Sequence, residues 1–370
     1  MMKKTFAVLV TILLVLSCST DDSGNGSGDN FDRGALLVNW ADNIIVPAYQ
    51  NFLNKMNVLE QSSTTFTTTP NQSNLDDLRL KWLDAYKAWQ YVEMFNIGKA
   101  EEITYSFYVN VYPLNITDVE NNIANGSYDL TLVNNQDAQG FPAIDYLING
   151  IAATDTDIIN KFTTDTNATA YKTYLNDVVA RIESLTELVL NDWNNGYRDT
   201  FVANSGNTVT SAVNKLVNDF IFYYEKGLRA NKIGIPAGVF SSTPLPDKVE
   251  AYYKSDVSKV LANESLQAVK DFFNGKHFNS TATGKSLVSY LDYLNTIKDG
   301  SDLSLLINTQ FNTAASKLTA LNNDFTVQIN TDNTKMTEAF DELQRAVVLM
   351  KVDMLQALNI SVDFVDADGD

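Results

Sequence analysis

The chain has 370 residues with 27 basic and 45 acidic side chains, which gives a formal net charge of −18 at pH 7. So acidic a surface repels the phosphates of nucleic acids and anionic lipid headgroups, which argues against nucleic acid as a partner. The single cysteine, Cys18, excludes a disulfide within the chain, so packing alone must hold the fold. A chain of this length favours two domains.

The first 17 residues are expected to be a signal peptide. Lys3 and Lys4 precede an apolar run, Phe6 to Leu16, that is shorter than the roughly 20 residues a membrane-spanning helix needs. The run ends in Val15-Leu16-Ser17-Cys18, which resembles a bacterial lipobox. Cys18 is therefore the expected lipidation site, and the membrane is an expected partner through this lipid anchor. An ordinary secretory signal with an incidental cysteine is the alternative.

Residues 18–33 are expected to form a flexible tether, because Gly, Ser, Asn and Asp dominate them. The acidic Asp21 and Asp22, just after Cys18, resemble the export signal of surface lipoproteins in the Bacteroidetes group. We therefore expect a protein that is lipid-anchored in the cell outer membrane and exposed at the cell surface.

Beyond the tether, apolar residues recur every three or four positions almost throughout, which predicts helices. The first run begins at Leu37 and ends at Met56, and the second spans Leu75 to Val92. Further runs cover residues 174–189, 213–228, 257–260, 266–273, 287–294, 303–325 and 336–354. No alternating strand pattern stands out, so the predicted fold class is all-α, with two packed helical bundles.

Turn-forming residues separate these runs. Asn194-Asn195-Gly196 is expected to stop one helix, and Lys298 to Asp302 to end another. We place the domain boundary at the first of these turns. The predicted domains are an N-terminal helical bundle over residues 34–195 and a C-terminal helical bundle over residues 196–370.

The stretch Gly140-Phe141-Pro142-Ala143-Ile144-Asp145 predicts a turn that runs into a helix. Pro142 lacks an N–H and has a fixed φ, which suits the first helical turn. Asp145 is expected in that first turn, where the helix dipole stabilises a carboxylate by roughly 0.3–1 kcal/mol. A helix start with a dipole partner is the simplest interpretation. The alternatives are a carboxylate that lines a ligand cleft and, least favoured, a catalytic zinc site.

Six blocks in the chain, taken in order, resemble the imelysin-like (peptidase M75) family, in the form found in Bacteroidetes lipoproteins. The resemblance covers nearly the whole chain after the signal peptide. The blocks are Trp40 to Phe52, Trp82 to Phe95, Gly140 to Gly150, Asn231 to Gly238, Pro246 to Tyr253 and Leu358 to Asp370.

The resemblance implies two helical bundles, a signature at the cleft between them, an envelope location and an association with iron uptake. The family signature is G-x-H-x-x-E, whose His and Glu lie three apart on one helix face and could share a metal. In this chain Gly140 matches the glycine, but Pro142 stands at the histidine position and Asp145 at the glutamate position. Because Pro142 cannot bind a metal, peptidase chemistry is not expected.

Glu93 matches an acidic position of the family and is the expected partner of Asp145. With Gly140 and Pro142, these two acids form the predicted ligand-binding set. Iron is the cofactor we consider, since Fe³⁺ is a hard ion that favours carboxylate and phenolate oxygens. An iron-uptake receptor is a further partner to consider.

Two other candidate sites are weaker. The only histidine, His277, lies in a polar turn and is expected at the surface, whereas a zinc peptidase needs two or three His or Glu ligands and a general base. Asp363, Asp366, Asp368 and Asp370 resemble the start of a calcium loop that lacks its downstream acid, so an acidic tail is the simpler interpretation.

Three functions remain open from the sequence. The first is a cell-envelope protein that binds a ligand, plausibly iron-related, between the two bundles without catalysis. The second is a metallopeptidase of the M75 type, and the third is an interaction scaffold with a degenerate site. Pro142 favours the first and the third.

Overall fold

Helices make up most of residues 29–364, the part of the chain that the computed structural model describes. The predictions for the signal peptide, Cys18 and the first eleven residues of the tether, and for Asp366, Asp368 and Asp370, lie outside these residues. The predicted all-α class is confirmed. Within the described part, the only strands are β1 (Ile297–Lys298) and β2 (Ser301–Asp302), an antiparallel pair formed by the turn predicted there.

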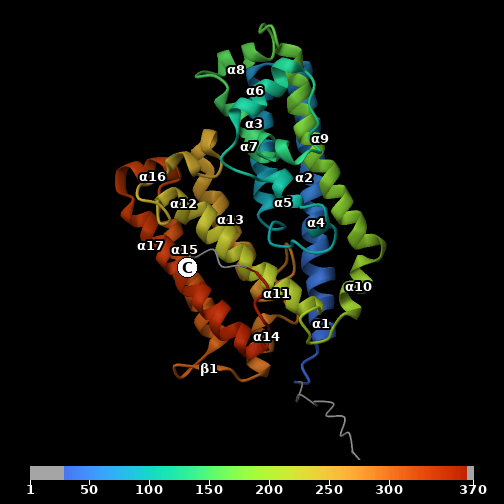
Figure 1. The fold of residues 1–370 in the computed structure, drawn as a ribbon, viewed down its shortest axis with the longest axis vertical. Helices are drawn as coiled ribbons and strands as arrows, with labels where there is room; N and C mark the ends of the chain where they lie inside the picture. The colour runs from blue at the N-terminus through green and yellow to red at the C-terminus, as the bar shows by residue number, and fades with distance from the viewer. Residues whose placement is uncertain (1–28, 365–370) are drawn as a thin grey trace, which may run out of the picture. The chain divides into compact units, whose positions relative to one another are not determined.

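A long helical segment opens the described chain. It consists of α1 (Arg33–Val38), the π-helical η1 (Asn39–Ile45) and α2 (Val46–Thr68). Helix α2 packs against α3 (Gln72–Trp89) and α9 (Ala168–Asp192), and Figure 1 shows these three running alongside one another. The amide oxygen of Asn71 accepts a hydrogen bond from the Asn74 N–H and so caps the start of α3.

Shorter helices connect α3 to α9. They are α4 (Lys99–Glu102), α5 (Tyr105–Val109), α6 (Ile116–Asn125), η2 (Val133–Ala138), α7 (Gly140–Asp145), the π-helical η3 (Tyr146–Gly150) and α8 (Asp155–Lys161). Helix α7, which carries the signature stretch, packs against α9.

The predicted stop at residues 194–196 is a kink. Helix α9 runs into η4 (Trp193–Tyr197), where Gly196 has a φ of 134° that breaks the helical path before α10 (Arg198–Ala203). From Phe31 onward the contacts group the chain into one unit. The division into bundles at residues 34–195 and 196–370 therefore stays a prediction.

The second half of the chain is again helical. Helices α13, α15 and α17 pack in sequence against one another, and α17 and α13 also contact η5. The elements are α11 (Ala212–Phe222), η5 (Tyr223–Gly234), α12 (Ile235–Ala237), η6 (Pro246–Lys248), η7 (Tyr252–Val257), α13 (Ser258–Phe273), α14 (Leu287–Tyr293), α15 (Leu303–Thr319), α16 (Phe325–Asp332), α17 (Thr334–Val348), η8 (Leu349–Met354) and α18 (Leu355–Leu358).

One predicted run divides in the structure. The spacing over residues 303–325 suggests one helix, but α15 ends at Thr319 and Phe325 begins α16. The Asp324 carboxylate accepts hydrogen bonds from the N–H groups of Thr326 and Val327. This cap satisfies free backbone donors at the start of a new helix. Hydrophobic spacing alone does not predict such a start.

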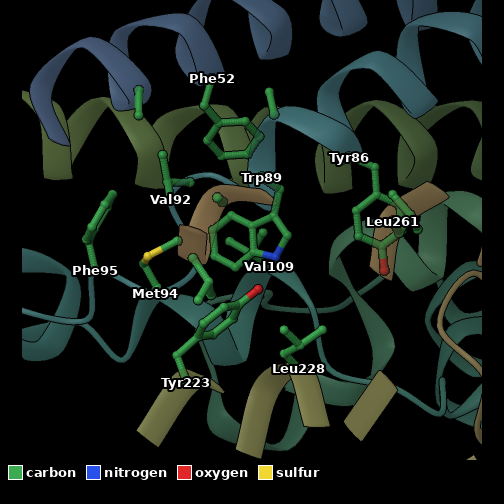
Figure 2. Close-up of a cluster of buried hydrophobic side chains, with 14 of the residues drawn as sticks. Phe52, Tyr86, Trp89, Val92, Met94, Phe95, Val109, Tyr223, Leu228 and Leu261 are labelled. Atoms are coloured by element: carbon green, nitrogen blue, oxygen red, sulfur yellow. The ribbon is translucent and has the colours of Figure 1, made fainter. Parts of the chain in front are cut away.

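Aromatic side chains from both halves share the hydrophobic core. Trp40, Trp82, Trp89 and Trp193 are at most 1% exposed. In Figure 2 the Trp89 ring lies between Phe52 of α2 and Tyr223 of η5, with Leu228 and Leu261 nearby. Within the described residues, no helix combines the length and apolarity that crossing a bilayer would require.

Candidate functional site

The start of α7 fixes the position of the signature stretch. Gly140 has a φ of +78°, and a Cβ at this position would lie 2.3 Å from the carbonyl oxygen of Val109. Only glycine therefore fits here, for both conformation and space. Pro142 is the third residue of α7, in the first turn, where a missing N–H leaves no intrahelical bond unmade. The predicted turn into a helix is confirmed at both positions.

Asp145 lies deeper in the helix than the sequence suggested. It is the sixth and last residue of α7, and the chain continues directly into η3, so the prediction of a first-turn dipole partner is wrong. The reason is that α7 already begins at Gly140, which leaves Asp145 more than one turn from the helix start. Its carboxylate must therefore be stabilised by specific hydrogen bonds rather than by the helix dipole.

Two hydrogen bonds hold the buried Asp145 carboxylate. Its Oδ2 accepts from the backbone N–H of Tyr253 at 2.9 Å, and its Oδ1 accepts from the Asn149 side-chain amide at 2.9 Å. The side chain is fully buried, and burial raises the pKa of Asp145 to about 7, although both hydrogen bonds act in the opposite direction. Near neutral pH this carboxyl group is therefore poised between its two protonation states.

Asp145 lines a cavity of about 230 Å³, which we name the Asp145 cavity. Its walls come from the loop after α5, from α7 and from the segment around η6 and η7, so both halves of the chain contribute. The lining residues are Tyr112, Pro113, Leu114, Ile116, Pro142, Asp145, Asp247, Lys248, Val249, Ala251, Tyr252 and Tyr253. Pro142 and Asp145 thus share one cavity, whereas Gly140 acts by its close contact with the backbone of Val109.

Glu93, the other predicted acid, has different partners. One carboxylate oxygen accepts a hydrogen bond from the Asn110 amide at 3.3 Å, and the other lies 3.4 Å from the Lys232 ammonium. Asp145 shares neither contact, because its partners are Asn149 and the backbone of Tyr253. The structure therefore assigns the two predicted acids to separate environments.

Glu93, Lys232 and Glu250 form what we name the acid–lysine cluster. The Lys232 ammonium lies 2.8 Å from both carboxylate oxygens of Glu250, and the three side chains are 13%, 2% and 2% exposed, respectively. Burial lowers the pKa of Lys232, but the two carboxylates outweigh it and raise the pKa, so this lysine stays charged. Burial is also the main cause that raises the pKa of Glu93.

Neutral side chains complete the hydrogen bonding of this cluster. Asn110 donates to Glu250 at 2.9 Å and accepts from the Tyr86 hydroxyl at 2.5 Å. Gln90 donates to Glu250 at 3.4 Å and accepts from the Ser265 hydroxyl at 2.6 Å. A buried network of this kind positions its members, because each loses hydrogen bonds if it moves.

Lys232 and Glu250 were not predicted as site residues. Each carried a weak signal in the sequence, namely a charged residue with apolar residues directly beside it. Lys232 precedes Ile233-Gly234-Ile235, and Glu250 stands between Val249 and Ala251. A charge in such a position is rarely buried unless it is paired, so it indicates an ion pair inside the protein.

Glu93 also lines a second cavity of about 330 Å³, the Glu93 cavity. Tyr112 lines both cavities. The remaining walls come from the segment that contains α5 and from the join of α11 and η5. The lining residues are Glu93, Met94, Asn96, Ser106, Phe107, Asn110, Val111, Tyr112, Asp219, Phe222, Tyr223, Lys226, Gly227 and Asn231.

The residues of these two cavities differ in how well they suit a metal. Across residues 29–364, no set of three or more His, Cys, Asp or Glu side chains is placed to hold one. In the acid–lysine cluster, the ammonium of Lys232 already fills the place between the carboxylates where a cation would bind. The Asp145 cavity instead combines the carboxylates of Asp145 and Asp247 with the phenol groups of Tyr112, Tyr252 and Tyr253, which are oxygen atoms of the type that Fe³⁺ prefers, and Lys248 is the one cation among the described residues of its lining.

His277 contributes to neither cavity. It is partly exposed in the turn after α13, where its backbone N–H donates to the Ala282 carbonyl oxygen. Glu101 and Glu102 are exposed.

Fold and site together define an all-α protein in which residues from both halves of the chain line two cavities, and each cavity is lined by an acid, Asp145 or Glu93. The family model for imelysin, the peptidase M75 family, matches residues 45–351, and the chain belongs to this family. The resemblance inferred from the sequence blocks is confirmed.

Two solved structures share the fold. An imelysin-like protein from Psychrobacter arcticum is 16% identical with a TM-score of 0.68, and the match covers 90% of this chain and 97% of that one. A protein described as an iron-regulated protein A precursor, from Parabacteroides distasonis, is 18% identical with a TM-score of 0.71, over 89% and 97% of the two chains. No curated protein matched the chain.

Proposed function

We propose that this imelysin family member is a cell-envelope binding protein that takes an iron-related ligand in the Asp145 cavity and catalyses no reaction. The observation that carries the proposal is the cavity itself, where a buried carboxyl group and three tyrosines meet between segments from both halves of the chain. Carboxylate and phenolate oxygens are suitable ligands for ferric iron. The description of one structural neighbour as iron-regulated supports the same assignment.

The envelope location in this proposal rests on the N-terminal sequence. The lipobox-like Val15-Leu16-Ser17-Cys18 favours a lipid anchor at Cys18, and the acidic residues after it favour the surface of the outer membrane. A protein held there meets extracellular ligands directly, and an iron-uptake receptor is the partner that we propose. Labelled fatty acid incorporated into wild-type protein, but not into Cys18→Ser, would test the anchor.

The absence of catalysis is proposed from the residues at the signature. A catalytic zinc site uses three protein ligands, and Pro142 stands where the signature histidine would supply one. Metal-dependent cleavage of casein that disappears in Asp145→Ala would overturn this part of the proposal and establish the peptidase alternative.

Calorimetry on the purified protein tests the binding. Fe³⁺ supplied as its nitrilotriacetate complex, Fe²⁺ under anaerobic conditions and haem are titrated in turn, and we expect at least one to bind. Tyr252→Phe removes one phenol oxygen from a side chain that is 43% exposed, so it should weaken binding by about tenfold or more without unfolding the protein.

The matched control is Tyr293→Phe, which removes the same atom from a 50% exposed tyrosine on α14, outside the cavity lining. It should bind like the wild type. If none of the three iron probes binds, the iron-related part of the proposal fails. If Tyr252→Phe and Tyr293→Phe both behave like the wild type, the ligand does not occupy the Asp145 cavity.

A further inference from the structure

The acid–lysine cluster carries more negative than positive charge. Two carboxylates share one ammonium, and the sharing is unequal, because Lys232 is 2.8 Å from Glu250 but 3.4 Å from Glu93. Glu93 is therefore the less compensated acid of the two. It is also the one that lines the Glu93 cavity, where a second cation could reach it. A buried charge without full compensation is costly, and an arriving cation would relieve that cost.

A second acid lines the same cavity. Asp219 comes from α11, and burial, followed by the negative charges of Glu101 and Asp363, raises its pKa to about 8, while Lys215 acts in the opposite direction. Nothing anionic is favoured next to these groups, since the whole chain is also acidic. Lys226 lines the cavity too, but it is partly exposed, so solvent screens its charge more than that of Glu93.

Aromatic side chains form the apolar part of this cavity. Phe107 and Phe222 line it while 56% and 40% exposed, and the Phe222 ring also lies 5.4 Å from that of Phe364. Tyr112 and Tyr223 line it as well. Aromatic faces attract cations, and rings of this kind bind organic ammonium ions in many proteins.

Tyr223 is a further polar side chain beside Glu93. It is only 6% exposed, and burial, followed by the negative charge of Glu93, raises the pKa of its hydroxyl well above the usual value. The ring lines the Glu93 cavity, and in Figure 2 its oxygen points toward Trp89 and Val109 at the base of the aromatic cluster. The hydroxyl therefore stays protonated, and the ring adds to the aromatic lining of the cavity beside Glu93.

We infer that the Glu93 cavity binds an organic ammonium ion, whose positive charge pairs with Glu93 and whose apolar or aromatic substituent lies against Phe107, Phe222 and Tyr112. The cavity volume of about 330 Å³ lies in the range of small-molecule sites. The inference does not depend on what the Asp145 cavity binds.

A set of three probes of similar size tests the charge requirement. Phenethylammonium, the uncharged 2-phenylethanol and the anionic 3-phenylpropionate are titrated into the purified protein by calorimetry. We expect the ammonium ion to bind at least about tenfold more tightly than the alcohol, as one charge-assisted contact provides, and the anion not to bind. Equal affinities for all three probes, or binding of none, would overturn the inference.

Glu93→Gln keeps the size of the side chain and leaves Lys232 and Glu250 as a one-to-one ion pair. We expect this variant to lose its preference for the ammonium ion over the alcohol, to within about twofold. Glu102→Gln is the matched control, since Glu102 is exposed and paired with Lys99, and it should keep the full preference.

Asp219→Asn is a second variant, which keeps the test valid if Glu93→Gln does not fold. It removes the other acid of the cavity and, in titrations at pH 8.5, above the pKa of about 8 at which Asp219 loses its proton, should also reduce the preference for the ammonium ion. An unchanged preference in Glu93→Gln, or in Asp219→Asn where only that variant folds, would contradict the inference.

Discussion

The two cavities on either side of Tyr112 each end on a buried acid, yet the protein stabilises these acids in different ways. Asp145 is held by two neutral donors, an amide side chain and a backbone N–H. Glu93 belongs to a cluster that contains a full positive charge, on Lys232. Burial raises the pKa of both acids, but Asp145 accepts its hydrogen bonds from neutral donors, whereas Glu93 shares the positive charge of Lys232 with Glu250.

The comparison shows why the family signature cannot be interpreted residue by residue. The position of the signature acid is kept in the structure, but with Pro142 beside it this acid has hydrogen-bond donors instead of a metal-binding histidine. The stronger electrostatic feature lies elsewhere, in a cluster that spans Glu93, Lys232 and Glu250.

The largest expected effect comes from removing the positive charge of the cluster. Lys232→Met leaves two buried carboxylates without their shared cation, so it should lower the free energy of unfolding by about 3–5 kcal/mol. Urea denaturation measures this. Lys317→Met breaks an exposed pair with Glu338, where solvent screens both charges, and should lower the free energy of unfolding far less. Similar losses in the two variants would show that the cluster contributes no more than a surface ion pair.

The next effect concerns the pH dependence that Asp145 imposes. An unfolded aspartate loses its proton near pH 4, whereas folded Asp145 keeps it to about pH 7, so unfolding releases a proton between these values. The free energy of unfolding should therefore fall as pH rises through this window and level off above it. Asp145 should contribute at most about 4 kcal/mol to this fall. Asp145→Asn should lack this component.

Urea denaturation of both proteins between pH 4.5 and pH 8.5 gives the comparison. The difference between wild type and Asp145→Asn isolates Asp145 from the other acids, including Asp219, whose pKa is also raised. Parallel curves for the two proteins would mean that Asp145 ionises at its ordinary pKa.

A smaller effect distinguishes two costs at the start of α7, that of a positive φ and that of a steric clash. Gly140→Ala places a Cβ 2.3 Å from the Val109 carbonyl oxygen at a positive φ, and should cost about 2–3 kcal/mol. Gly126→Ala also has a positive φ, but no atom lies within 4 Å of its Cβ, so it should cost only about 1 kcal/mol. Equal losses in a thermal or urea melt would show that the close approach to Val109 relaxes at no cost.

The fold could be predicted largely from hydrophobic spacing, because the spacing reflects the same buried faces that the helices use. Trp82 and Trp89 are seven residues apart on α3, and both are buried in the hydrophobic core, as that spacing requires. The π-helical segments could not be predicted, since the pattern does not distinguish them from ordinary turns of helix. One of them, η5, carries both Tyr223 and Lys232.

The site could be predicted only where it is local. Gly140 and Pro142 act through their own backbone, so the sequence was sufficient for them. One partner of Asp145, Asn149, is four residues away, but the other is the backbone of Tyr253, 108 residues away, and no local pattern reveals that contact. The same holds for Glu93, whose cation Lys232 lies 139 residues further along the chain.

The most direct test of this account is one set of calorimetric titrations, in which two variants each meet two probes. Glu93→Gln should lose its preference for phenethylammonium and keep the affinity of the wild type for the iron probe that binds. Tyr252→Phe should show the reverse. If each variant binds both probes more weakly to the same degree, the two cavities act as one site. This result would contradict the distinction between the two acids.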